Sequence, residues 1–180
     1  MPSTEPDPSA VRVAVQGTTA LICVRGRGSF QMGPALKQFG VSAIEQGCRR
    51  LILDMDDCVS MDSTFMGVLA GLALRLRDEG GDGVVVMNLN AKALALLKTL
   101  GLDRLIETYE AGEMPDELRE HLDEVFDMAS LDLGGADKKL SLETMLSAHE
   151  DLVRASPDNQ PKFQNVLDYL SQDLRKLEED

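Results

Sequence analysis

The chain has 180 residues, with 31 acidic and 18 basic side chains and a formal net charge of −13. This excess of negative charge argues against a nucleic-acid partner, because proteins that bind DNA or RNA present basic surfaces to the phosphates. No apolar run is long enough to cross a bilayer, so we expect no membrane insertion. The first residues also lack the basic and apolar regions of a signal peptide.

The cysteines and the distribution of charge give two further expectations. Cys23, Cys48 and Cys58 match no disulfide framework or zinc-binding spacing, so a reduced, cytoplasmic protein is expected. Residues 1–110 carry 13 acidic and 11 basic side chains, whereas residues 111–180 carry 18 and 7. The acidic second part is typical of solvated amphipathic helices, or of a module that attracts a basic partner or covers a basic surface on the first part.

The first part of the chain predicts an α/β domain. Residues 1–10 contain three prolines and predict a flexible tail. Apolar residues at helical spacing predict helices that begin near residues 34, 65 and 91. Alternating or continuous apolar segments predict strands, at residues 11–15, 20–24, 51–55, 84–87 and 108–109. The order β-β-α-β-α-β-α-β predicts one mostly parallel sheet covered by helices, within a domain at residues 11–112.

Residues 113–180 predict an acidic, all-α extension of about three helices. Apolar stripes mark these helices at residues 118–126, 142–153 and 163–177, and the last two are expected to form an αα-hairpin. The stripes must be buried against the α/β domain, against each other or against a second chain. In the last case the C-terminal helices would mediate homo-oligomerisation.

No motif of an enzyme or a metal site is present, so we predict no catalytic residue, cofactor or metal. His149 lies on an apolar stripe, which is typical of a packed histidine with satisfied ring nitrogens. The glycines of residues 26–33 lack the spacing of a phosphate-binding loop and are interpreted as the end of a strand. The acids near residue 57 are interpreted as solvated loop residues, namely Asp54, Asp56, Asp57 and Asp62.

Ser63 lies where the strand at 51–55 and its polar connection lead into the helix near Phe65. Its hydroxyl suits an N-cap, and a helix N-terminus also tolerates a phosphate through its free N–H groups and dipole. A phosphate on Ser63 would add negative charge beside Asp57 and Asp62 and repel an acidic partner surface. An exposed Ser63 could therefore act as a switch that keeps the fold and ends binding.

The segment around Ser63 resembles the STAS domain of anti-sigma-factor antagonists. Met61-Asp62-Ser63-Thr64-Phe65-Met66-Gly67 is similar to the family motif of an aliphatic residue, Asp, Ser, Ser or Thr, a small residue, any residue and Gly. The strand at 84–89 and Leu97-Lys98-Thr99-Leu100-Gly101-Leu102 are similar to later family segments, so the resemblance covers about residues 11–110.

This resemblance implies a non-enzymatic bacterial regulator of transcription. Such a protein binds an anti-sigma factor that is also a serine kinase, and phosphorylation of the motif serine, here Ser63, ends the binding. Met61, Asp62 and Thr64 would lie beside Ser63 at the partner interface. The ATP would belong to the kinase.

Two departures from the family pattern leave an alternative open. Phe65 replaces a small residue and either obstructs a kinase or turns inward. Gly26-Arg27-Gly28-Ser29 replaces a segment that carries acidic residues in the family. The alternative is a constitutive STAS scaffold or assembly subunit, in which Ser63 is only a helix cap and the C-terminal helices mediate oligomerisation.

Overall fold

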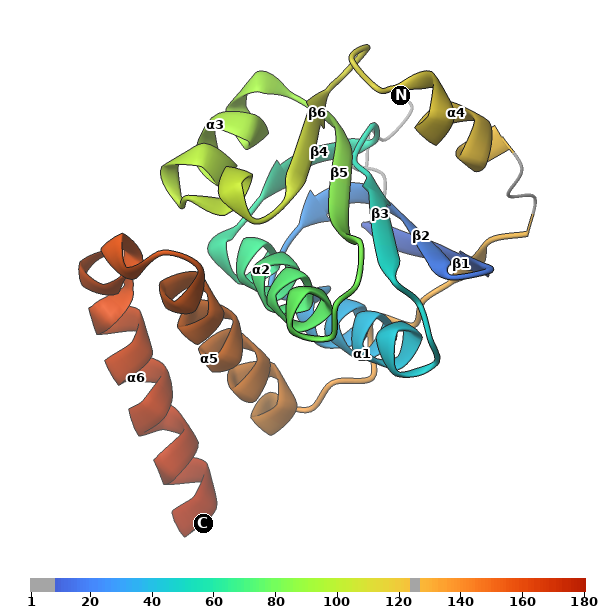
Figure 1. Cartoon of the computed structure of the whole chain (residues 1–180). Coiled ribbons are helices and arrows are strands. Elements are labelled where there is room, and N and C mark those ends of the chain that lie inside the picture. The colour runs from blue at the N-terminus through green and yellow to red at the C-terminus, as the bar shows by residue number, and fades with distance from the viewer. Residues whose placement is uncertain (1–8, 124–126) are drawn as a thin grey trace, which may run out of the picture.

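The computed structural model describes residues 9–123 and 127–180. Most of the predicted tail at 1–10 lies outside these residues, and Ala10 already belongs to the first strand. In the part of the chain that is described, seven strands form one sheet, with the order β6-β5-β3-β2-β1-β7 and β4 paired to β2. The predicted α/β class with a mostly parallel sheet is confirmed (Figure 1).

The central strands follow the apolar segments of the sequence. β1 (Ala10–Gln16) and β2 (Thr19–Gly28) form an antiparallel hairpin. Three further strands then add in parallel, with β6 at the edge of the sheet. They are β3 (Arg50–Asp54), β5 (Gly83–Leu89) and β6 (Glu107–Glu110). Parallel pairing requires crossover connections, which the intervening helices provide.

Helices cover both faces of the sheet. α1 (Gly33–Glu45), α2 (Ser63–Asp78) and α3 (Ala91–Thr99) contribute to the larger core cluster, which includes Leu36, Leu69 and Leu97. The short α4 (Asp116–Asp123) lies on the opposite face (Figure 1), where its Leu118 packs with Leu21 and Ile52. Both faces of the central strands are therefore covered, which explains why these strands carry apolar side chains on both faces, as is typical of a parallel sheet.

Two short strands differ from the predictions. β4 (Cys58–Met61) lies inside the segment predicted to be a polar connection, and it pairs with β2 over Gly26–Gly28. β2 therefore runs past the predicted segment at 20–24 and ends at Gly28. β7 (Ala129–Ser130) pairs with β1 within a predicted loop. Strands of two to four residues with mixed polarity carry too little periodicity to be recognised in the sequence.

The predicted αα-hairpin at the C-terminus is present. α5 (Lys138–Ala155) and α6 (Gln160–Glu179) are joined by the 3₁₀ turn Pro157–Asn159, and α5 packs along α2 (Figure 1). The helix predicted at 118–126 corresponds to α4, with residues 124–126 outside the described part. None of the described helices is long and apolar enough to span a bilayer.

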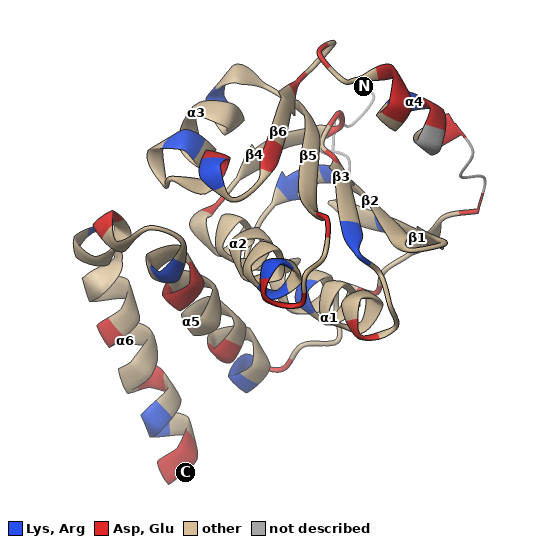
Figure 2. Ribbon diagram, in the orientation of Figure 1, with Lys and Arg blue, Asp and Glu red and all other residues tan. Residues whose placement is uncertain are grey.

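The acidic excess of the extension is local. Residues 111–137 carry nine acidic side chains and one basic side chain, whereas residues 138–180 carry nine and six. Figure 2 shows the acidic residues gathered on α4, while α5 and α6 carry both signs. The hairpin that packs on α2 is therefore close to balanced in charge.

Candidate functional site

The N-terminus of α2 is capped by Asp62, which corrects the prediction that Ser63 is the cap. Asp62 Oδ1 accepts a hydrogen bond of 2.9 Å from the Phe65 N–H, as an N-cap side chain does. Its second oxygen, Oδ2, accepts one of 2.8 Å from the Phe30 N–H. One carboxylate thus joins the start of α2 to the loop between β2 and α1, and Ser63 is the first residue of the helix.

Phe65 turns inward. Its ring is 0% exposed and lies in the main core. It packs over Gly28 of β2, where a Cβ would lie only 3.1 Å from the ring. The bulky residue beside Ser63 is therefore accommodated by the absence of a side chain at Gly28, and it does not block Ser63 from outside.

Ser63 is in contact with His149 of α5, 86 positions later in the chain. The Ser63 Oγ lies 2.9 Å from His149 Nε2, in a half-buried position. The expectation of a freely exposed Ser63 is therefore wrong in this conformation, because α5 covers its hydroxyl. The expectation of a packed histidine is confirmed, since His149 is 3% exposed and both ring nitrogens have partners.

The partners of the imidazole determine the direction of this hydrogen bond. His149 Nδ1 lies 2.7 Å from the Met145 carbonyl oxygen, which can only accept, so Nδ1 carries a hydrogen. In the neutral ring, Nε2 is then an acceptor and the Ser63 hydroxyl donates to it. The other face of the contact is closed by Phe163 of α6, whose ring centroid lies 5.2 Å from that of His149.

Small residues allow α5 to approach α2 closely. A Cβ at Gly67 would lie 2.3 Å from the Ala148 carbonyl oxygen, and one at Gly71 would lie 2.3 Å from Asp151 Oδ2. Glycines four positions apart share one face of a helix. They form, with Ala148 and Asp151, a contact that we call the α2–α5 seam, and Ser63 lies at its N-terminal end.

The predicted partner-binding residues differ in how far they are exposed. Met61 is 8% exposed and Thr64 is 4% exposed, so their side chains belong to the core, whereas Asp62 and Ser63 are half-buried. The sequence did not single out two apolar side chains that are exposed nearby. Phe30, in the loop that Asp62 binds, is 44% exposed, and Val59 on β4 is 67% exposed.

The other chemical groups that were considered have structural roles. Asp54 Oδ1 accepts hydrogen bonds from the Asn88 amide and the Asp56 N–H. Among the described residues, no group of three or more His, Cys, Asp or Glu side chains could hold a metal ion. A cavity of about 440 Å³ between α1, α2 and α5 is lined by neither Ser63 nor His149. The cavity is therefore separate from this Ser–His pair.

All three cysteines are free thiols with a raised pKa. Burial, reinforced by the nearby Asp54 carboxylate, raises the pKa of Cys23 to about 11. Burial also raises the pKa of Cys48 and of Cys58 above the ordinary value. Since the thiolate is the nucleophile, these thiols are poorly reactive at neutral pH.

Comparison with known proteins places most of this fold in one family. Residues 11–107 match the family described as "Mlab, STAS domain". Among curated protein sequences, no match is found. The STAS resemblance seen in the sequence is confirmed by the family match.

Several solved structures share this fold at low sequence identity. An anti-sigma factor antagonist from Mycobacterium paratuberculosis is 18% identical, with a TM-score of 0.53 over 66% of this chain and 97% of that chain. SpoIIAA in its unphosphorylated form is 17% identical, with a TM-score of 0.52 over 64% of this chain and 100% of that chain. TM1081 of Thermotoga maritima is 18% identical, with a TM-score of 0.52 over 62% and 92% of the two chains. At this identity the likeness concerns the fold.

Proposed function

The chain belongs to the STAS domain family, and on that premise we propose that it is an anti-sigma-factor antagonist, a protein-binding regulator rather than an enzyme. Its partner is an anti-sigma factor that is also a serine kinase, and Ser63 is the residue that the kinase phosphorylates. Binding frees a sigma factor, and phosphorylation ends binding. The protein needs no cofactor of its own and acts in the cytoplasm of a bacterium.

The observation that carries this proposal is the position of Asp62 and Ser63. They lie at the N-terminus of α2, where Asp62 bonds the loop of the exposed Phe30, and the exposed Val59 lies on β4, the strand that leads into α2. We infer that these two side chains supply apolar contacts to the partner at the rim of the polar Asp62–Ser63 site. The Asp62 carboxylate fixes the loop that carries Phe30 to the helix that carries Ser63, so both sides of the surface are held in one arrangement.

A phosphate at Ser63 would act on this surface through its charge. It would bring about two negative charges to a place that already holds Asp62. The free N–H groups and the dipole of the first helical turn would stabilise the phosphate itself. The phosphate would thus repel an acidic surface of the partner, while the packing of the sheet would stay unchanged.

The test is phosphorylation of the full chain by a purified serine-kinase anti-sigma factor with magnesium and ATP. We expect one phosphoryl group on the wild type by intact mass and none on Ser63→Ala. Ser60→Ala, which changes an exposed serine on the adjacent strand β4, is the matched control and should be labelled like the wild type. A phosphoryl group on Ser63→Ala would show that Ser63 is not the residue that the kinase phosphorylates.

A constitutive scaffold is the second candidate, and the hairpin favours it. Of the apolar stripe on α6, only Leu170 is fully buried, while Val166 is 38% exposed and the neighbouring Tyr169 is 63% exposed. A second copy could cover this face. Light scattering over a range of concentrations separates the candidates, because a scaffold that assembles through α6 gives oligomers that Val166→Glu dissociates. A monomer at all concentrations would count against it.

A further inference from the structure

The contact between Ser63 and His149 couples the C-terminal hairpin to the site of modification. We propose that the α5–α6 hairpin is a cover over Ser63 and α2, and that a negative charge at position 63 releases it. The proposal rests on the proposed role of Ser63 as a phosphorylation site. It adds that the phosphate acts first on this chain's own helices.

A phosphate on Ser63 is incompatible with the present hydrogen bond between Ser63 and His149. With 2.9 Å between Ser63 Oγ and His149 Nε2, no phosphorus atom fits between the two atoms. If the serine side chain rotates away instead, Nε2 loses its partner while the ring is only 3% exposed. A buried polar nitrogen without a partner is costly, so either movement weakens the docking of α5.

The neighbours of His149 offer no compensation for a new charge. The ring is held by a backbone carbonyl at Met145 and by the phenyl ring of Phe163. Neither group carries a positive charge, and the Phe163 contact continues the packing from α5 to α6. A displacement of His149 therefore loosens both helices of the hairpin rather than one side chain.

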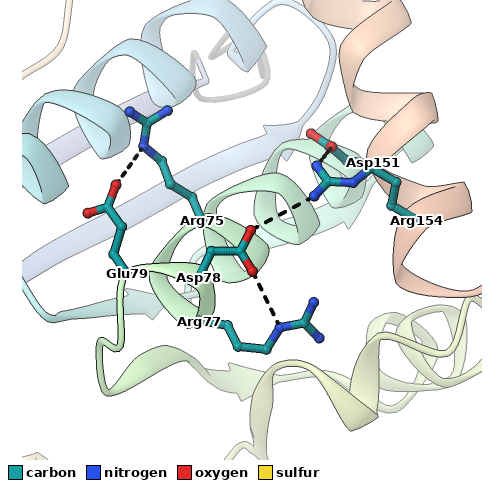
Figure 3. Close-up of polar contacts among 6 residues, drawn as sticks. All are labelled: Arg75, Arg77, Asp78, Glu79, Asp151 and Arg154. Carbon is teal, nitrogen blue, oxygen red and sulfur yellow. Dashed lines mark hydrogen bonds and ion pairs between the residues drawn. The ribbon is translucent and has the colours of Figure 1, made fainter.

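The far end of the α2–α5 seam, where Gly71 meets Asp151, lies beside a cavity and exposed ion pairs. The cavity has a volume of about 440 Å³ and is lined by residues that include Lys37, Arg75 and Asp151. The ion pair between Arg154 of α5 and Asp78 of α2 spans 4.0 Å with both side chains about 60% exposed, and Figure 3 shows it beside the Asp151–Arg154 pair. Exposed pairs of this kind contribute little to stability.

The turn Pro157–Asn159, between α5 and α6, is held by its own hydrogen bonds and can act as a hinge when the hairpin opens. The Asn159 amide, 1% exposed, donates to the carbonyl oxygens of Leu100 and Leu152, and Lys162 Nζ donates to the Thr99 carbonyl. The bonds to Leu100 and Thr99 tie the turn to the end of α3, and the bond to Leu152 ties it to the last turn of α5. Local opening of a structural unit at a lower free energy than global unfolding is common in proteins.

By linkage, the effect is reciprocal. A docked hairpin protects Ser63 from the kinase, and a modified Ser63 disfavours docking. The kinase then acts only on a minor, open conformation. The rate of phosphorylation is proportional to the fraction of molecules in which the hairpin is open. The stability of the docked hairpin therefore determines the rate at which Ser63 is phosphorylated.

Hydrogen–deuterium exchange of the full chain, read by mass spectrometry, tests this without a kinase. Ser63→Glu places a charge at the site, and Ser60→Glu is the matched control on the exposed strand β4. In Ser63→Glu we expect exchange to rise about ten-fold or more in residues 140–155, a factor that corresponds to about 1.4 kcal/mol. β3 and β5 should keep the protection of the wild type, and Ser60→Glu should show neither change.

Every other result overturns the proposal. Unchanged or slower exchange in α5 would mean that the hairpin tolerates the charge, for example by pairing it with a protonated His149. Loss of protection in β3 and β5 as well would mean that the charge breaks the domain rather than opening a cover. Neither result bears on whether a kinase labels Ser63, so a failure here is distinct from a failure of the proposed function.

A reversible clamp gives a second measurement. A Cβ at Gly71 would lie 3.7 Å from the Asp151 Cβ, which suits a disulfide. Gly71→Cys/Asp151→Cys should therefore lock the seam when oxidised, and the native thiols, with their raised pKa, should exchange slowly with it. Adding Ser63→Glu should speed exchange in α5 only after reduction. Equal exchange in both redox states would contradict the cover.

Discussion

Gly28 and Phe65 are in direct contact, and the missing side chain of one makes room for the ring of the other. A Cβ at Gly28 would lie 3.1 Å from the ring atoms of Phe65, which is 0% exposed. This pair explains two departures from the family pattern at once, because the glycine at the end of β2 and the phenylalanine near Ser63 fit each other.

Gly28→Ala should destabilise the domain by about 1–3 kcal/mol, since overpacking forces a buried ring from its position. Urea denaturation would measure the loss as a lower midpoint with an unchanged slope. Gly135→Ala is the matched control, because a Cβ there meets nothing within 4 Å. Equal stability of the two variants would show that Phe65 can move without cost.

The sequence predicted the sheet and helices well where periodicity was long. β2, β3 and β5 are continuous apolar segments, and α2 has a clear apolar stripe, so burial alone identifies them. β4 was missed because a strand of four residues, of mixed polarity, carries no such pattern.

The contact at Ser63 could not be predicted, for a different reason. It depends on how the hairpin docks, and 86 positions separate Ser63 from His149. One local signal was present, since glycines inside a helical pattern at 67 and 71 indicate a close neighbour. The histidine on the apolar stripe of α5 was the other signal, and together they would have indicated a polar contact at a tight helix pair.

Ser63→Ala should cost about 1–3 kcal/mol, because it leaves His149 Nε2 buried without a partner. The loss is not that of a helix cap, which Asp62 provides. In the double variant Ser63→Ala/His149→Phe both polar groups are gone, so its destabilisation should be smaller than the sum of the single losses. Strict additivity in urea denaturation would show that the hydrogen bond does not stabilise the fold.

Asp62→Ala should cost about 1–2 kcal/mol through loss of the cap on Phe65. It should also loosen the loop at Phe30, whose N–H loses its acceptor. Thermal unfolding measures the first effect, and hydrogen exchange at residues 29–32 measures the second. Asp62→Asn is the control for the cap, because its amide oxygen still caps the helix, whereas the NH2 group that replaces Oδ2 cannot accept the Phe30 N–H. Both variants should therefore speed exchange in the loop, while only Asp62→Ala loses the cap. Wild-type exchange at residues 29–32 in both variants would show that the bond to Phe30 does not order the loop.

Asp151 gives the seam a dependence on pH. Burial raises its pKa above the ordinary 3.8, although Arg154 opposes this. The folded state then binds the proton more tightly than the unfolded state, so this carboxyl lowers the free energy of unfolding as pH rises through and above 3.8. Asp151→Asn should therefore be more stable than the wild type at neutral pH, with the advantage lost in acid. Glu150→Gln, on the exposed side of α5, is the control, and an Asp151→Asn advantage that grew in acid would contradict the sign.

Val59 and Phe30 should contribute to partner binding and little to stability. Val59 is 67% exposed, so Val59→Ser should change the free energy of unfolding by less than about 0.5 kcal/mol. If these side chains are anchors of the interface, each serine variant should weaken binding of a purified anti-sigma factor by about ten-fold or more in calorimetry. Val15→Ser is the matched control, because Val15 is 55% exposed beside the β1–β2 turn, in β1 rather than at the start of α2. Full affinity in both Val59→Ser and Phe30→Ser would show that the partner does not bind at the N-terminus of α2. A charge on Ser63 would then have no direct effect on partner binding.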